Sequence, residues 1–113
     1  MLVKFRNSQN KMALGLLSLM LKEHDAKQLQ QLMQLYEQNP DMEMYFWKEE
    51  EKYIGIIGIE VQEKEFIIKH LAVLPSFRGE GIGRAMVSEI QKKYSDLTMN
   101  ATEETEAFVQ SLY

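Results

Sequence analysis

Apolar and polar residues along the chain follow two periods, the alternation typical of strands and the wider spacing typical of helices. In chain order, the predicted strands are 2–6, 44–48, 53–61, 66–73 and 96–100, and the predicted helices are 11–22, 25–39, 82–94 and 103–112. Strands interleaved with helices in this way predict an α/β (α+β) fold, with a mixed sheet of about five strands and helices on both faces.

Two of the strands and one helix carry more specific signals. Residues 66–73 are apolar at nearly every position, which predicts a central strand covered on both faces. Gly55 and Gly58 lie among isoleucines in another strand, so we expect that strand either to bulge or to be approached closely by another group. Asp25, followed by Gln28, resembles a capping box at the start of the second helix.

The composition narrows the class of protein. A chain of 113 residues suits one domain spanning residues 1–113. It has no cysteine and only two histidines, so we expect no disulfide and no metal site. No apolar segment is long enough for a membrane span or a signal peptide, which predicts a cytoplasmic protein with no membrane partner.

The charge is unevenly distributed. The net charge of -4 argues against nucleic acid as a partner. Residues 66–84, however, carry Lys69, Arg78 and Arg84 against Glu80 as their acidic residue. This locally positive segment is suited to an anionic ligand.

A glycine loop lies between the apolar strand and the third predicted helix. Gly79, Gly81 and Gly83 let the backbone turn tightly and point N–H groups outward at the positive end of a helix dipole, which is typical of phosphate binding. Arg78 and Arg84 flank the loop and can add charge-assisted hydrogen bonds to a diphosphate. The alternative is a glycine-rich turn needed only for chain reversal.

Two common phosphate-binding motifs do not match this loop. A Walker A loop requires Lys followed by Ser or Thr after its last glycine, but Gly83 is followed by Arg84 and Ala85. The dinucleotide fingerprint requires Gly-x-Gly-x-x-Gly, whereas the spacing here is Gly-x-Gly-x-Gly. P-loop NTPases and dinucleotide-binding enzymes are therefore excluded.

The pattern Arg78-x-x-Gly81-x-Gly83, with the preceding segment from Ile67 to Pro75, resembles the acyl-CoA-binding motif of the GCN5-related N-acetyltransferase (GNAT) family. The resemblance implies one GNAT-type acyl-CoA-binding domain with a mostly antiparallel sheet. It implies transfer of an acetyl group from acetyl-CoA to an amine of a small molecule or a protein, with coenzyme A as product and a homodimer as a possible assembly. Among small members, the chain is most similar to those encoded with riboflavin-biosynthesis genes in Bacillus-type bacteria.

The resemblance also implies which residues hold the cofactor. The pantetheine arm is expected along strand end 71–73, the diphosphate on the N–H groups of 79–84, and the thioester carbonyl near the Leu71 amide. Asn100 is expected beside the pantetheine. The implied acetyl-CoA-binding residues are Leu71, Ala72, Val73, Arg78, Gly79, Glu80, Gly81, Ile82, Gly83, Arg84 and Asn100.

The catalytic groups are less strongly indicated. An alkylamine is protonated near neutral pH, so a group must remove its proton before it attacks. His70 is the first candidate because of its ordinary pKa and its place on the key strand, with packing as the alternative role. Glu65 and Glu60 are further candidates, unless they are only solvated acidic residues. Three aromatic residues have two alternative roles, either lining an acceptor pocket or packing in the core: Tyr36, Trp47 and Tyr53.

The last predicted helix departs from the family's pattern. Members often place a general-acid tyrosine after a phenylalanine, whereas here Val109 follows Phe108. The chain also ends where members usually add one or two strands that wall the acceptor site. These departures keep one alternative open, a catalytically weak acyl-CoA-binding sensor or interaction module. A separate alternative is a structural dimerisation domain whose glycine loop is only a turn and which binds no CoA.

Overall fold

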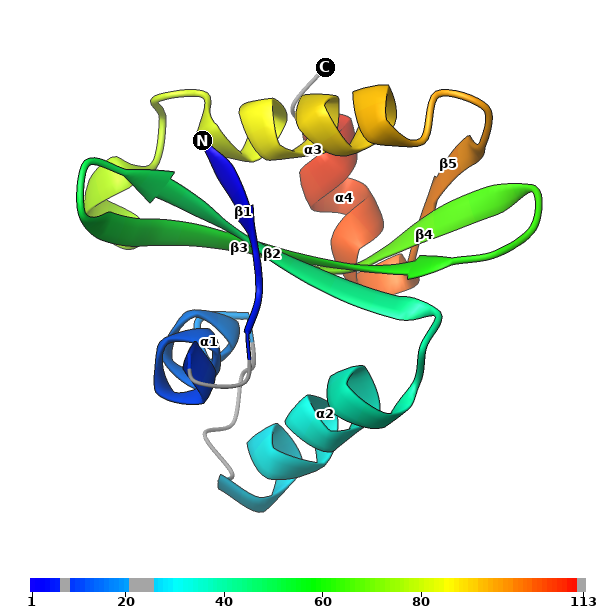
Figure 1. Ribbon diagram of the computed structural model, residues 1–113. Helices are drawn as coiled ribbons and strands as arrows, with labels where there is room; N and C mark the ends of the chain where they lie inside the picture. The colour runs from blue at the N-terminus through cyan, green and yellow to red at the C-terminus, as the bar shows by residue number, and fades with distance from the viewer. Residues whose placement is uncertain (7–8, 21–25, 112–113) are drawn as a thin grey trace.

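The computed structural model describes residues 1–6, 9–20 and 26–111 (Figure 1). Its elements are β1 (Leu2–Lys4), α1 (Asn10–Leu17), α2 (Ala26–Gln38), β2 (Met42–Glu49), β3 (Lys52–Val61), β4 (Glu65–Val73), a 3-10 helix (Pro75–Phe77), α3 (Ile82–Lys93), β5 (Thr98–Ala101) and α4 (Glu103–Ser111). The predicted fold class is confirmed as mixed α/β with a mostly antiparallel sheet. Over the described ranges, each helix is too short or too polar to cross a bilayer.

The five strands lie in the sheet in chain order, from β1 to β5. Strands β1 to β4 pair antiparallel, whereas β5 pairs parallel with β4 after the chain has crossed over through α3. The segment 66–73, predicted as a central strand, is an interior strand that pairs with β3 and β5. This segment, as β4, lies fourth, and the middle strand is β3, where every residue from Ile54 to Ile59 is buried.

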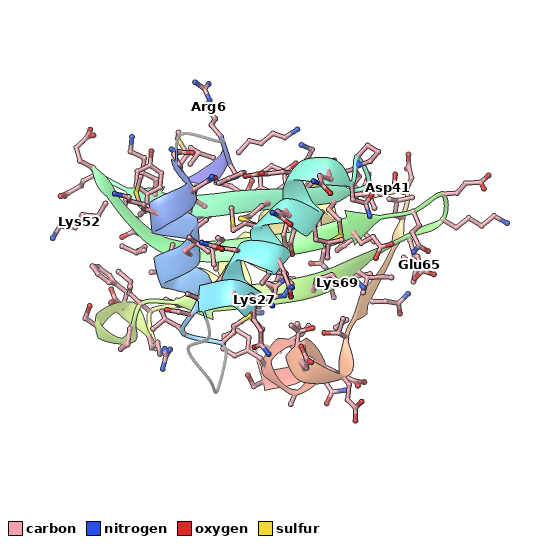
Figure 2. All side chains as sticks on the ribbon, turned by 90° about the horizontal axis from the view of Figure 1, so that it is seen from below. Arg6, Lys27, Asp41, Lys52, Glu65 and Lys69 are labelled. Carbon is pink, nitrogen blue, oxygen red and sulfur yellow. The ribbon has the colours of Figure 1, made fainter. Side chains whose placement is uncertain are left out.

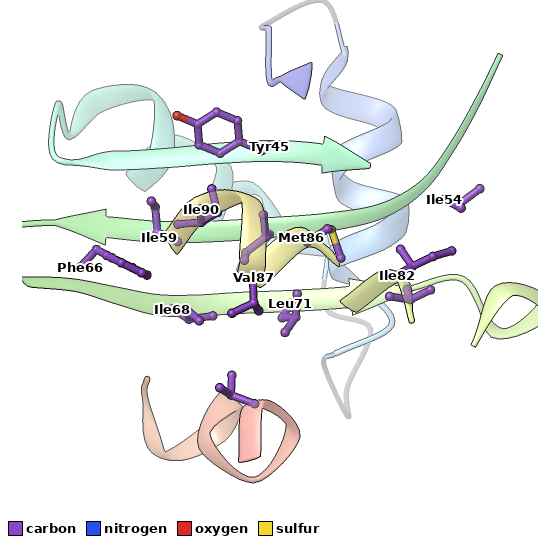
Figure 3. Close-up of a cluster of buried hydrophobic side chains, with 13 residues drawn as sticks. Tyr45, Ile54, Ile59, Phe66, Ile68, Leu71, Ile82, Met86, Val87 and Ile90 are labelled. Carbon is purple, nitrogen blue, oxygen red and sulfur yellow. The ribbon is translucent and has the colours of Figure 1, made fainter. Parts of the chain in front are cut away.

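Helices cover both faces of the sheet, as predicted. Helices α1 and α2 lie on one face and α3 lies on the other (Figure 1). Figure 3 shows Met86, Val87 and Ile90 of α3 packed over β3 and β4, and Val109 of α4 belongs to the same buried cluster. A second cluster fills the face of α1 and α2. Its helical members are Ala13, Leu16, Leu17, Met33 and Tyr36.

The two glycines of β3 are both explained by close approach. A Cβ on Gly55 would lie 3.0 Å from the Met86 Cε atom, and a Cβ on Gly58 would lie 1.9 Å from the Tyr36 hydroxyl oxygen. The register with β2 also shifts beside Gly55, where Ile54 is an extra residue of β3 with no partner on β2. Bulging and close approach, which were predicted as alternatives, therefore occur together.

Helix α1 is shorter than predicted because its end tightens. After Leu17, the N–H groups of Leu19 and Met20 bond to carbonyls three residues back instead of four, which ends the α-helix in a 3-10 turn. The predicted capping box at Asp25 and Gln28 cannot be compared, because Asp25 lies outside the described residues. The other helices end within two residues of their predicted limits.

A polar cluster ties the end of α3 to strand β2. The hydroxyl groups of Tyr45 and Tyr94 each donate to the Glu43 carboxylate at 2.6 Å, and Lys93 Nζ donates to the Tyr45 hydroxyl at 2.5 Å. Burial acts to raise the pKa of Glu43, but the two hydroxyl hydrogen bonds and the charge of Lys93 hold it below its usual value. The carboxylate is therefore stabilised in its charged form.

Candidate active site

Strand β4 loses its parallel neighbour partway along its length. Its pairing with β5 ends at Ile68 opposite Ala101. Beyond this point the Thr102 N–H and the buried Thr105 hydroxyl both donate to the Ile68 carbonyl, at 3.2 and 2.7 Å. The rest of β4, from Lys69 to Val73, therefore has an edge that no strand in the described part of the chain covers.

A bulge in β4 decides which groups face this edge. Lys69 has no partner on β3, because His70 pairs with Gly58 while Ile68 pairs with the next residue of β3. The extra residue shifts the alternation of the strand, so that Ile68 and Leu71 both point into the core beneath α3. His70 lies on the opposite face, against α2.

Leu71 and Val73 direct their backbone polar groups toward the open edge. The Leu74 N–H bonds to a carbonyl of β3 at 2.9 Å, and bonded residues alternate along an antiparallel pair, so Leu71 and Val73 face away from β3. The Leu71 N–H donates to Met20 Sδ at 3.0 Å, and the Val73 carbonyl accepts from Arg78 Nε at 3.0 Å. The edge thus presents a backbone donor and a backbone acceptor to an extended ligand.

The glycine loop connects β4, through the 3-10 helix, to α3. Gly79 and Gly81 have φ angles of 84° and 82°, a region that favours glycine. A Cβ on either would meet nothing within 4 Å, so the backbone conformation rather than crowding explains these glycines. Helix α3 begins at Ile82 without a capping side chain, which leaves its first-turn N–H groups suited to an anion.

Two adjoining cavities, which we call the β4 groove, follow the loop and the open edge. The loop cavity of about 390 Å³ and the edge cavity of about 310 Å³ share Val73, Arg78 and Phe108. The predicted cofactor-binding residues that line this groove are Leu71, Ala72, Val73, Arg78, Gly79, Gly81, Ile82, Gly83 and Arg84. Glu80 lies in the loop between lining residues but does not line the groove.

A tyrosine and a histidine form a pair on the opposite face of β4. The Tyr36 hydroxyl oxygen lies 2.5 Å from His70 Nδ1, and it reaches this place by crossing Gly58. Tyr36 is only 7% exposed, so its hydroxyl proton needs an acceptor, and its partner among the described residues is Nδ1. The O–H therefore donates to Nδ1, which assigns the proton of the neutral ring to Nε2.

The environment keeps both members of this pair uncharged. Burial, with the nearby charge of Lys69 acting in the same direction, lowers the pKa of His70 to about 4. Burial also raises the pKa of Tyr36 well above its usual value, with the charge of Glu60 adding to the effect. A ring with Nδ1 engaged and so low a pKa is a weak base near neutral pH. The geometry favours His70 as a hydrogen-bond donor over the predicted role of general base.

His70 lines a further cavity of about 560 Å³, which we call the acidic cavity. Its other lining residues are Lys69, Thr102, Glu103 and Glu104. Lys69 is paired with Glu60, with 3.1 Å between Nζ and Oε1, and hydrogen bonds from Gln62 and Lys69 lower the pKa of Glu60. Glu104 lines both this cavity and the β4 groove, so it stands where the two meet. Within the described ranges, no group of three or more His, Asp or Glu side chains is arranged to hold a metal ion.

Several predicted site residues are not brought to these cavities. Glu65 lies at the far end of β4 from the glycine loop, beyond Lys69 (Figure 2). Asn100 is exposed on β5, and it lines none of the cavities described above. The roles of Glu65 and Asn100 stay predictions. Trp47 packs against the cluster beneath α3, whereas Tyr53 packs against the cluster that contains Tyr36, and neither Trp47 nor Tyr53 lines the cavities described above.

Helix α4 contributes residues that the sequence analysis missed. Val109, at the place of the expected tyrosine, is buried with α3, whereas Glu104, Thr105 and Phe108 line the β4 groove. Glu104 and Phe108 are separated by one helical turn, and that spacing is a signal that could have identified a shared face. Met20 also lines the groove, although the sequence indicated only a place in a buried helix.

Comparison with known proteins agrees with this geometry. The model of the acetyltransferase (GNAT) family matches residues 13–113. The chain is 43% identical over 111 residues to an uncharacterized N-acetyltransferase in the lysA 3' region of Bacillus methanolicus, covering 97% of this chain and 92% of that protein. The name of that relative gives no link to riboflavin-biosynthesis genes, so the expected similarity to riboflavin-linked members is not supported.

Solved structures share the fold at low sequence identity. The aminoglycoside N-acetyltransferase AAC(6')-Iy in complex with CoA superposes with a TM-score of 0.79 at 14% identity, over 99% of this chain and 85% of that one. The ribosomal-protein-alanine N-acetyltransferase of Brucella melitensis biovar Abortus 2308 gives 0.77 at 15% identity, over 100% and 87%. These likenesses show the fold, and the family model together with the Bacillus methanolicus relative shows more: this chain belongs to the GNAT family of acetyltransferases.

Proposed function

We propose that this chain is an acetyl-CoA-dependent N-acetyltransferase that transfers the acetyl group to an amine of a small molecule or a protein. The observation that carries the proposal is the Leu71 N–H, which lies outside the sheet's ladder on an open strand edge continuous with the glycine loop. An arm that contains amide groups can pair with such an edge, and a diphosphate can bind at such a helix start. Family membership and the CoA complex of a fold neighbour support the same ligand.

The described residues divide the binding of acetyl-CoA between them. The backbone of Leu71 and Val73 pairs with the pantetheine arm along the open edge. The first-turn N–H groups of α3, together with Arg78 and Arg84, hold the diphosphate. The Leu71 N–H donates to the thioester carbonyl oxygen and stabilises the negative charge that develops there when the amine attacks.

The transfer itself needs a base and a proton donor. The incoming ammonium group loses one proton before attack. The new C–N bond then forms as the C–S bond breaks, and the second proton that leaves the nitrogen goes to the CoA thiolate. Glu104 lies between the β4 groove and the acidic cavity, so its carboxylate is placed to hold the incoming ammonium group and to accept its proton. His70, as a neutral donor lining the same cavity, orients the acceptor.

A second candidate is an acyl-CoA-binding module with weak turnover. Val109 favours it, because this residue is buried and leaves α4 without a hydroxyl at the place where the family often has its general acid. Both candidates require acyl-CoA binding, so binding alone does not separate them. Release of CoA that depends on an amine does.

The first test is thermal unfolding with and without acetyl-CoA. A ligand that binds only the folded state stabilises it by about 2.7 kcal/mol at one hundred times its Kd, which is readily seen as a rise in Tm. We expect a clear rise, and no rise at saturating ligand would refute both candidates. It would leave the dimerisation domain, whose glycine loop is only a turn.

The second test is CoA release, measured with a thiol reagent, in the presence of an amine panel. The panel contains an aminoglycoside, a peptide with an N-terminal alanine, a lysine peptide and spermidine. Release with one of these amines supports the transferase, and binding without release supports the module. Glu104→Gln should then lower kcat, whereas Glu106→Gln, an exposed change on the same helix outside both cavities, should not.

A further inference from the structure

The amide at the open edge already has a partner from within the chain. The Leu71 N–H donates to Met20 Sδ at 3.0 Å. Met20 follows the tightened end of α1, where its own N–H bonds to the Leu17 carbonyl at 3.0 Å. Its side chain is half-buried and lines the edge cavity of the β4 groove. A side chain just beyond α1 thus covers the donor that the proposed reaction needs.

A thioether is a poor permanent partner for this donor. Sulfur of this kind is a weak hydrogen-bond acceptor, and a carbonyl oxygen is a better one. The contact therefore holds the amide only until a stronger acceptor arrives. Met is also unbranched and flexible, so the side chain can leave the amide by rotating while the backbone of α1 stays in place.

From this contact we propose that Met20 is a displaceable plug over the Leu71 amide and that its bulk restricts the transferred acyl group to acetyl. The inference rests on the proposed function, since it takes the Leu71 N–H as the site of the thioester carbonyl. A carbonyl oxygen and the Met20 sulfur cannot bond to the same N–H at the same time. We place the acyl carbon atoms beyond the carbonyl in the edge cavity, which the Met20 side chain also lines.

Less flexible groups share the edge cavity with Met20. Thr105 and Phe108 of α4 line the same cavity from across the groove, and Ala72 lies on β4. Thr105 is held in place by its 2.7 Å hydrogen bond to the Ile68 carbonyl. Met20 is the flexible member of this set, so its length decides how much room an acyl group finds.

Three variants separate size from the sulfur contact. Met20→Ala removes the Cγ, Sδ and Cε atoms and opens the cavity. Met20→Leu keeps most of the bulk but removes the sulfur acceptor. Met12→Ala is the matched control, because Met12 lies on α1, the helix just before Met20, has 41% of its surface exposed and does not line the groove. Calorimetric Kd values for CoA, acetyl-CoA and butyryl-CoA are measured with each protein.

We expect the wild-type protein, Met20→Leu and Met12→Ala to bind acetyl-CoA roughly tenfold or more tightly than butyryl-CoA, as is typical when extra methylene groups meet a filled pocket. In Met20→Ala the two Kd values should become about equal. Unchanged discrimination in Met20→Ala, or equal binding of both thioesters by the wild-type protein, would overturn the size limit. Discrimination lost equally in Met20→Leu would assign it to the sulfur contact and also overturn the size limit.

The same Kd values also distinguish failure of the Met20 plug from failure of the proposed function. Acetyl-CoA binding with unchanged discrimination in Met20→Ala refutes the plug while leaving the proposed function intact. Absence of any CoA or acetyl-CoA binding refutes the proposed function and the plug with it. Because the wild-type comparison of chain lengths needs no variant, the size limit stays testable even if Met20→Ala does not fold.

Discussion

The neutral state of His70 has a measurable consequence for stability. The ring is buried against α2, accepts a hydrogen bond from Tyr36 and lies near the ion pair of Lys69 and Glu60. Glu103 and Glu104 line the cavity on its other side. Burial first and the Lys69 charge second lower its pKa from 6.5 to about 4. The folded protein therefore resists protonation of this ring.

The direction in which stability changes with pH follows from the number of protons bound to the folded and unfolded states. Between about pH 4 and pH 6.5 the unfolded chain carries a protonated His70 while the folded protein does not. Acidification through this window therefore favours unfolding, and above pH 6.5 the effect is absent because the ring is neutral in both states. A shift of this size corresponds to about 3 kcal/mol when the window has been crossed completely.

The variant His70→Gln removes the titrating imidazole. We expect urea unfolding of the wild-type protein to show a free energy of unfolding that falls as the pH drops below 6.5, and His70→Gln to lose most of that slope. The imidazole pKa values come from an NMR titration, which is simple to assign because His24 and His70 are the only histidines and His24→Gln identifies the other signal. A His70 signal that titrates near 6.5, or an unchanged slope in His70→Gln, would contradict a neutral, buried His70.

Substitutions at three other positions give further measurable effects. Gly58→Ala should destabilise the fold by about 1–3 kcal/mol in urea unfolding, because the new Cβ would lie 1.9 Å from the Tyr36 hydroxyl oxygen; a neutral result would contradict that packing. Gly81→Glu should abolish acetyl-CoA binding, measured by calorimetry. The control Gly15→Ala, in open space on α1, should leave binding unchanged and raise the free energy of unfolding by about 0.5–1 kcal/mol. Glu43→Gln should lower the free energy of unfolding at neutral pH and flatten its decline below pH 4.5. The lowered pKa of Glu43 gives stability that is present above pH 4.5 and is lost as the pH falls through the folded-state pKa of this group. Parallel curves of unfolding free energy against pH for variant and wild type would count against this prediction.

The sequence was informative where the signal is local. Alternation and helical spacing depend on neighbouring residues, and they predicted the order of elements and the mixed sheet. The glycine loop was also locally readable, since Gly79 and Gly81 have the positive φ angles that only glycine adopts easily. The position of each strand within the sheet could not be predicted in the same way. A nearly continuous apolar run marks both β3 and β4, and their order depends on which strands pair.

The contacts of the site depend on groups far apart in the chain. Met20 reaches Leu71 and Tyr36 reaches His70 only after α1 and α2 have packed on the sheet. The spacing of apolar and polar residues does not predict contacts between residues so far apart in the chain. The short end of α1 was missed for a similar reason, because an apolar run is compatible with a helix that continues and with a tightened turn.

One irregularity links the two halves of the site. The extra residue at Lys69 turns His70 toward α2 and leaves the Leu71 N–H on the open edge, because each residue after the bulge faces the side opposite to the one that regular alternation would give it. Gly58 stands opposite His70, and its missing Cβ lets the Tyr36 hydroxyl reach the ring. The neutral imidazole beside the acidic cavity and the donor in the β4 groove are therefore placed by the same bulge. A change in strand pairing at this point would move both groups together, so the thioester donor and the acceptor-orienting ring that we propose are coupled through the backbone of β4.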